Sequence, residues 1–178
     1  FYMAPLLDGT HRCSTSFSME KLEGRDDIKP MWDLFEENGL SYLIMNVPTT
    51  TPAPKVKKGI VVGSAGGGLN KIEGIPENLV SSTDVIPALE SHDYIVDIRI
   101  PNSDYEKTAE MLDDLIVMEE RRTESFIDIC KSRGLGAGFL CNRGTTIIEY
   151  LARSEIESYE AYETMEEFMP RHSEKSWM

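Results

Sequence analysis

The feature that most constrains the fold is a nearly unbroken apolar run, Ser41 to Val47, which reads SYLIMNV. A run of this length without polar alternation is typical of a strand covered on both faces, as in the parallel sheets of α/β proteins. Gly59 to Gly63 and Gly136 to Cys141 predict two further buried strands. Between the first two runs, Pro48 to Pro54 holds three prolines. Prolines exclude a central strand or a helix interior, so a surface loop within one domain is expected there.

Helical patterns alternate with these strands. The first covers Lys29 to Asn38, with Asp26 or Asp27 as its cap, and ends at Gly39. A much longer one starts at a capping box, Ser103 with Glu106, and runs to about Arg133. About thirty residues of helix would span about 45 Å, so a break or bend is expected near Arg121 to Thr123. Two more helical segments are predicted at Thr146 to Arg153 and Glu155 to Phe168.

The segment from Asp93 to Ile100 alternates between apolar and polar residues, which predicts a half-exposed strand of the kind found at a sheet edge. His92 and Asp93 would then lie at the amino end of that strand. Ligands of parallel α/β sheets gather at the carboxyl ends, so a polar turn is favoured for this pair over a catalytic or metal role. Strands that alternate with helices favour an α/β fold, a layered and mainly parallel sheet flanked by helices.

Length and charge narrow the class of protein. The 178 residues suit a single α/β domain or fragment, with residues 1–25 irregular and residues 155–178 an acidic helical tail. The net charge of −13 opposes binding to a phosphate backbone, so no nucleic-acid partner is expected. No apolar run approaches the length of a membrane span. The N-terminal segment lacks the pattern of an intact secretory signal, which slightly favours a cytoplasmic location.

Common catalytic and binding motifs do not fit this sequence. The glycine-rich loop from Gly63 to Gly68 follows a strand, but it lacks the lysine of a Walker A loop and the spacing of a dinucleotide fingerprint. A nucleotide-binding domain that uses this loop is therefore the weakest hypothesis. No G-x-S-x-G elbow occurs, and the three histidines are widely spaced. Three cysteines without a C-x-x-C pair favour reduced thiols over a disulfide framework or a zinc cluster.

One larger pattern combines several of these elements. A helix, a strand, a proline-rich turn and a second strand follow one another in a fixed order and spacing, and they resemble the type I phosphodiesterase/nucleotide pyrophosphatase branch of the alkaline phosphatase superfamily. The resemblance covers roughly residues 28–152 and is carried by Pro30–Gly39, Tyr42–Pro48, Thr50–Pro52, Val56–Val62, Asp93–Asp97, Met118–Arg122 and residues 138–141. It implies the central part of an alkaline-phosphatase-like fold.

The resemblance also implies an activity. Such proteins hydrolyse phosphate esters with a Thr or Ser nucleophile and two divalent metals, commonly zinc. For this chain the resemblance implies a divalent metal, either zinc or manganese. The family's Asp-x-x-x-His ligand pair aligns with Thr146 and Tyr150, which are poor ligands for a divalent metal. Glu149 is a carboxylate, but it points about 100° away on a helix. The nucleophile segment would precede Phe1, and the last Asp-His element would follow Met178.

The resemblance therefore predicts a segment of a metal-dependent phosphodiesterase- or phosphatase-like hydrolase that is not catalytically complete alone. The full-length protein would act on a small phosphate ester, and the metal would not be bound by this chain alone. The alternative is a non-catalytic interaction or substrate-recognition module. The last 30 residues carry eight Glu against three basic residues, so they could dock a basic partner or keep the protein soluble.

Overall fold

A computed structural model of the chain describes residues 4–5, 13–14, 29–64, 74–98 and 105–151. The expected caps at Asp26, Asp27 and Ser103, the body of the glycine-rich loop and the acidic tail lie outside these residues. The elements in chain order are β1 (Ala4–Pro5), β2 (Cys13–Ser14), α1 (Met31–Glu37), β3 (Tyr42–Met45), β4 (Gly59–Val62), η2 (Glu77–Leu79), η3 (Thr83–Val85), α2 (Ile86–Ser91), α3 (Tyr105–Ser132), β5 (Ala137–Leu140) and α4 (Gly144–Leu151).

Three of the strands form one parallel sheet in the order β4-β3-β5. The central strand β3 pairs with both neighbours, so that Tyr42 lies opposite Gly59 on one side and Ala137 on the other. β1 and β2 form a separate antiparallel pair. The predicted mainly parallel sheet and the three apolar strands are therefore confirmed as an α/β arrangement.

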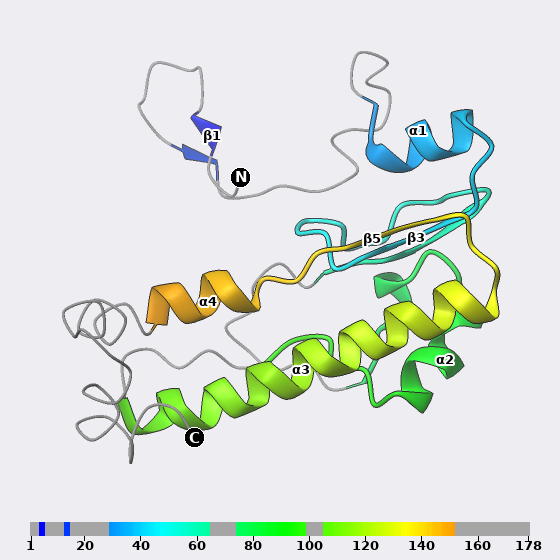
Figure 1. Ribbon diagram of the computed structural model, residues 1–178. Coiled ribbons are helices and arrows are strands. Elements are labelled where there is room, and N and C mark those ends of the chain that lie inside the picture. The colour runs from blue at the N-terminus through cyan, green and yellow to red at the C-terminus, as the bar shows by residue number, and fades with distance from the viewer. Residues whose placement is uncertain (1–3, 6–12, 15–28, 65–73, 99–104, 152–178) are drawn as a thin grey trace, which may run out of the picture.

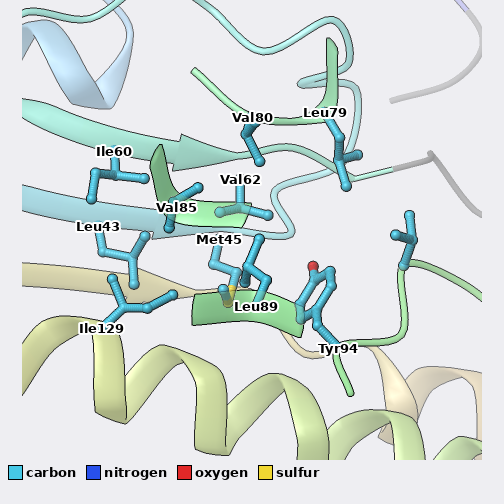
Figure 2. Packing of buried hydrophobic residues seen from close by; sticks show 11 residues of the cluster. Leu43, Met45, Ile60, Val62, Leu79, Val80, Val85, Leu89, Tyr94 and Ile129 are labelled. Atoms are coloured by element: carbon cyan, nitrogen blue, oxygen red, sulfur yellow. The ribbon is translucent and has the colours of Figure 1, made fainter. Parts of the chain in front are cut away.

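Both faces of β3 are covered, as its continuous apolar sequence predicted. All four of its residues are fully buried. Tyr42 and Ile44 point toward α1, while Leu43 and Met45 point into a larger core under α2 and α3. Figure 2 shows this larger core, where Leu43 and Met45 meet Leu89 of α2, Ile129 of α3 and the ring of Tyr94.

The first helix is held to the sheet by polar contacts as well as by apolar packing. None of the residues of α1 is fully buried, and the helix is followed by Gly39 in a left-handed conformation (φ 71°). Glu36 accepts hydrogen bonds from the backbone N–H of Lys57 (2.6 Å) and Lys58 (3.3 Å) and from the hydroxyl of Tyr42 (3.1 Å). These donors, the Lys57 N–H above all, hold the pKa of Glu36 below its usual range. Glu36 therefore ties α1 to the start of β4.

The long helix α3 is continuous from Tyr105 to Ser132, so the break expected near Arg121 to Thr123 does not occur, and a bend there stays a prediction. Thr123 and Ser125 donate their hydroxyl protons to the backbone carbonyls of Glu119 and Arg121, each at 2.7 Å. Both bonds lie within the helix, one turn back, so the polar residues are accommodated without a break. Figure 1 shows α3 crossing the sheet on the face opposite α1. No helix in the described ranges is long and apolar enough to cross a membrane.

Two strand predictions need correction. Residues 94–98 do not form a regular strand, because the carbonyls of Ile95 and Val96 accept hydrogen bonds from a buried arginine of α3 instead of from a neighbouring strand. Tyr94 and Val96 are buried as the alternation predicted, but Asp97, expected on the exposed side, is buried as well. β5 was expected to be buried, yet Phe139 keeps 43% of its surface exposed.

Candidate functional site

The carboxyl ends of the three parallel strands lie at one edge of the sheet, where ligands of α/β proteins usually bind. Asn46 follows β3, Ser64 follows β4 after one glycine, and Cys141 follows β5. The backbone continues the pairing there, since Asn46 N–H donates to the Val62 carbonyl (2.9 Å) and Cys141 N–H to the Met45 carbonyl (3.0 Å). Polar residues are therefore collected at this edge by the register of the sheet.

The proline-rich segment folds across the end of β4. Thr51 Oγ1 donates to the Ser64 carbonyl at 2.8 Å, and the Thr51–Pro52 peptide is cis. Thr50 is buried, with its hydroxyl donating to the Val47 carbonyl at 2.6 Å. A Cβ added to Gly63 would lie 2.5 Å from the Thr50 carbonyl oxygen, so only glycine fits beneath this turn.

Asn46 connects the end of β3 with the segment after α2. It has a left-handed backbone (φ 62°) and is 2% exposed. Its Oδ1 accepts a hydrogen bond from the Tyr94 hydroxyl, while its Nδ2 has no hydrogen-bond partner among the described residues. Burial raises the pKa of Tyr94 to about 12, against opposing effects of Arg122 and Asn46. The phenol is therefore neutral at physiological pH and can donate this bond.

Arg122 lies beside this pair in the middle of α3, with 3% of its side chain exposed. Its Nε donates to the carbonyl of Ile95 at 3.2 Å, and its Nη2 donates to the carbonyl of Val96 at 2.5 Å. The guanidinium thus fastens the irregular segment to α3, and it holds a positive charge behind the carboxyl edge.

Glu119, one turn before Arg122, faces the start of α4. Both of its carboxylate oxygens are buried without a hydrogen-bond partner in the described part of the chain, and the nearest cationic atom is Nη1 of Arg122 at 4.0 Å. A Cβ added to Gly144 would lie 3.1 Å from both Cγ and Oε1 of Glu119, which explains the glycine at the first position of α4. Nearby, Asn142 donates a side-chain bond to Thr123 Oγ1 at 3.3 Å.

The two positions predicted from the family's ligand pair both lie on α4, the helix that follows β5. Thr146 is in its first turn and is exposed. Tyr150 is near its end, four residues later, and the structure does not describe its side chain. The chain therefore places the pair after the carboxyl end of a strand, but this placement does not test whether either residue meets a metal, and the ligand assignment stays a prediction.

The described residues do not suit a divalent metal. No group of three or more His, Cys, Asp or Glu side chains comes together within the described ranges. A threonine hydroxyl and a neutral phenol at the two predicted positions are weak replacements for a carboxylate and an imidazole. We therefore derive no catalytic step through a metal.

The remaining polar candidates lie elsewhere. His92 follows α2 in a turn, as expected, and its Nε2 is 3.3 Å from Asp128 Oδ2 on α3. Cys130 and Cys141 are free thiols, and burial raises the pKa of Cys130. The chain has no match among protein-family models, curated proteins or solved structures. The site is therefore interpreted from its own geometry.

Residue patterns alone did not single out Tyr94, Glu119 or Arg122 as site residues. A signal for Arg122 exists in the helical spacing of α3, because it falls on the stripe of buried residues along that helix. An arginine at such a position needs internal acceptors, which predicts a buried polar contact. The buried residues of the stripe are Met111, Leu115, Met118, Arg122, Ser125 and Ile129. Glu119 lies next to the stripe, and its sequence position carries no comparable signal.

Proposed function

We propose that the chain is the sheet-forming central segment of a phosphodiesterase- or phosphatase-like hydrolase of the alkaline phosphatase superfamily, and that it is not catalytically complete alone. The observation that supports this proposal is the parallel order β4-β3-β5, which brings Asn46, the proline-rich turn and the β5–α4 connection to one carboxyl edge. These are the segments that carry the resemblance to the family. A small phosphate ester would bind at this edge.

The polar groups of the edge suit recognition better than bond cleavage. The buried Asn46 amide has a donor without a partner among the described residues, and Asn142 offers an exposed amide. Neither group is a nucleophile, and the family's nucleophile and its carboxylate–histidine ligand pair have no match in the 178 residues. Hydrolysis would therefore need groups beyond those that this chain supplies.

The proposal is tested by an amide NMR titration with bis(p-nitrophenyl) phosphate, followed by turnover assays with zinc or manganese. We expect millimolar binding that shifts the amides of residues 46–51, 63–64 and 141–146, and no turnover by the chain alone. Shifts confined to the opposite edge, or no shifts at all, would contradict binding at the carboxyl edge. Metal-dependent turnover would contradict the claim that the site is incomplete.

A matched pair of substitutions locates the binding site. Asn142→Ala removes an exposed amide at the carboxyl edge and should weaken binding by about tenfold, the loss expected for one good polar contact. Asn38→Ala removes an exposed amide after α1, at the other end of β3, and should leave binding unchanged. Equal effects of the two variants would contradict the assignment.

A further inference from the structure

A groove between α3 and α4 adjoins the carboxyl-edge cluster and shares Glu119, Thr123, Gly144 and Thr145 with it. It encloses about 640 Å³. Figure 1 shows the two helices side by side over the first part of α3. The walls are apolar, formed by Leu115, Ile116 and Ile127 of α3 and by Ile148 of α4. Ile116 and Ile127 are 52% and 44% exposed, so the groove presents apolar surface that the described residues leave uncovered.

Carboxylates line the groove between these apolar residues. Glu119, Glu120 and Glu124 all contribute to it. Arg121 pairs with Glu124 at 3.3 Å and Arg122 lies 4.0 Å from Glu119, so the three carboxylates exceed these two cations by one charge. The oxygens of Glu119 are buried and lack hydrogen-bond donors among the described residues. Glu120 and Glu124 are exposed, so cationic side chains of an occupant can form ion pairs with these two carboxylates.

The spacing along α3 determines the shape of the occupant. Eleven residues separate Ile116 from Ile127, which corresponds to about 16 Å of helix axis. A compact ion or a small amine would reach only one of these apolar positions. An elongated helix with an apolar stripe of about three turns can cover both of them while its flanking side chains meet the carboxylates.

The negative charge of the groove disfavours two other occupants, the chain's own C-terminal residues and a second copy of the chain. The chain's own residues 152–178 carry seven Glu against Arg153, Arg171 and Lys175, so they repel the acidic groove. A second copy of the chain also carries a net charge of −13 and would add the same repulsion. We propose that the α3–α4 groove docks a basic amphipathic helix of a partner protein, with apolar residues over Ile116 and Ile127 and lysine or arginine against Glu120 and Glu124.

The test uses a fluorescein-labelled synthetic helix of leucine and lysine, with the leucines on one face, and fluorescence anisotropy with the full chain. The double variant Ile116→Asn with Ile127→Asn should weaken binding by about tenfold or more, because both apolar contacts are lost. Val117→Asn is the matched control, since Val117 is 43% exposed on the same helix but does not line the groove. It should leave the affinity within about twofold.

A second pair of variants separates local from overall charge. Glu120→Gln with Glu124→Gln should weaken binding, whereas Glu90→Gln with Asp113→Asn, which changes the net charge equally at exposed positions outside the groove, should not. Equal losses in the two pairs would show attraction to overall charge and overturn the proposal. Equally tight binding of a scrambled peptide of the same composition would also overturn the proposal. Circular dichroism confirms that each variant is folded.

This inference does not rest on the proposed hydrolase function. The phosphate-ester titration is detected at residues 46–51, 63–64 and 141–146, whereas the Ile116 and Ile127 variants alter the outer wall of the groove. If the Ile116 and Ile127 variants lose peptide binding but keep phosphate-ester binding, the docking proposal is supported and the hydrolase proposal is unaffected. If the parent chain fails to bind the amphipathic peptide while phosphate-ester binding persists, the docking proposal fails and the hydrolase proposal does not.

Discussion

Arg122 shows how a charged residue is tolerated at a core position. Its side chain lies under the sheet edge with 3% exposure, where an unpaired charge would be strongly unfavourable. The consecutive carbonyls of Ile95 and Val96 accept its hydrogen bonds, so they are not available to pair with a strand. One residue of α3 therefore sets the conformation of a segment about 26 residues earlier in the chain.

We predict that Arg122→Met destabilises the protein by about 2 kcal/mol or more, because two buried carbonyls lose their donors. The free energy of unfolding is measured by urea denaturation followed by circular dichroism. Arg121→Met is the control, since Arg121 is 42% exposed and makes only a surface pair with Glu124. It should cost at most about 0.5 kcal/mol. Equal losses for the two variants would contradict the anchoring role of Arg122.

Single residues were the hardest part of the site to predict. The polar residues at Asn46 and Ser64 follow apolar runs, so their position at a carboxyl edge can be inferred from the sequence. The contact of Tyr94 with Asn46 joins residues 48 apart and depends on the turn after α2, which no local pattern specifies. Thr146 is found on the predicted helix, but its proposed relation to a metal ligand remains untested.

At the scale of elements, α1 depends on one carboxylate for its place on the sheet. The helix has no fully buried residue, and Glu36 receives three hydrogen bonds from the start of β4 and from β3. Because these bonds favour the charged form, the pKa of Glu36 is lower in the folded state than the ordinary glutamate value of 4.5. The stabilisation is complete above that value and is lost as the pH falls through the lower pKa of the folded state.

Glu36→Gln should therefore reduce stability by about 1 kcal/mol at neutral pH, since bonds to a charged acceptor are replaced by weaker ones. The difference from the parent should shrink as the pH is lowered below the ordinary carboxyl range, because the parent then loses the same charge. Urea denaturation at several pH values measures this. Glu37→Gln is the control, because Glu37 forms an exposed surface pair with Lys29. A gap that stays constant with pH would contradict the role of the Glu36 charge.

The elements themselves were predicted well where the apolar pattern is continuous. The runs at residues 41–47 and 59–63 give buried strands, because a strand covered on both faces needs apolar residues at every position. The alternating segment after residue 93 gave a wrong prediction, because the carbonyls of Ile95 and Val96 accept hydrogen bonds from Arg122 and Asp97 is buried together with its apolar neighbours. The break in α3 that was expected from the length of the helical pattern does not occur, and the serine and threonine of this stretch satisfy their hydroxyls within the helix.

At the scale of the whole molecule, stability is distributed unevenly over three layers. β3 is hydrogen-bonded on both sides and fully buried, whereas α1 lies on one face and β5 is partly exposed. Regions with many buried contacts open only on global unfolding, and thinly packed helices open locally. The sheet centre should therefore be the last part of the molecule to lose its protection.

We predict that the amides of residues 42–45 exchange with deuterium at least about tenfold more slowly than those of residues 33–37 in α1. Hydrogen–deuterium exchange with mass spectrometry of peptides from the two segments measures this ratio. The short helix α2 provides an internal reference, because it buries Leu89 in the main core. Equal protection of α1 and β3 would show that the helix opens only with the sheet.

The layered α/β architecture was predictable from the sequence, but the spatial order of the strands was not. Local patterns identify strands, and they do not say which strands pair. β3 pairs with a neighbour that follows it closely and with β5, where Gly136 is hydrogen-bonded to Ser41, 95 residues earlier. Such pairing is decided by packing across the whole chain. The relation to the alkaline phosphatase superfamily remains a proposal at this scale as well.

The central position of β3 has a consequence for synthesis. The strand is made before both of its partners, and the second partner is made about 95 residues later. At a synthesis rate of roughly 5 to 20 residues per second, one side of this apolar strand stays unpaired for about 5 to 20 s while the ribosome makes β5. An unpaired apolar edge can join with the wrong chain during that time. Slower translation between the codons for β4 and β5 would lengthen this exposed interval, and faster translation would shorten it.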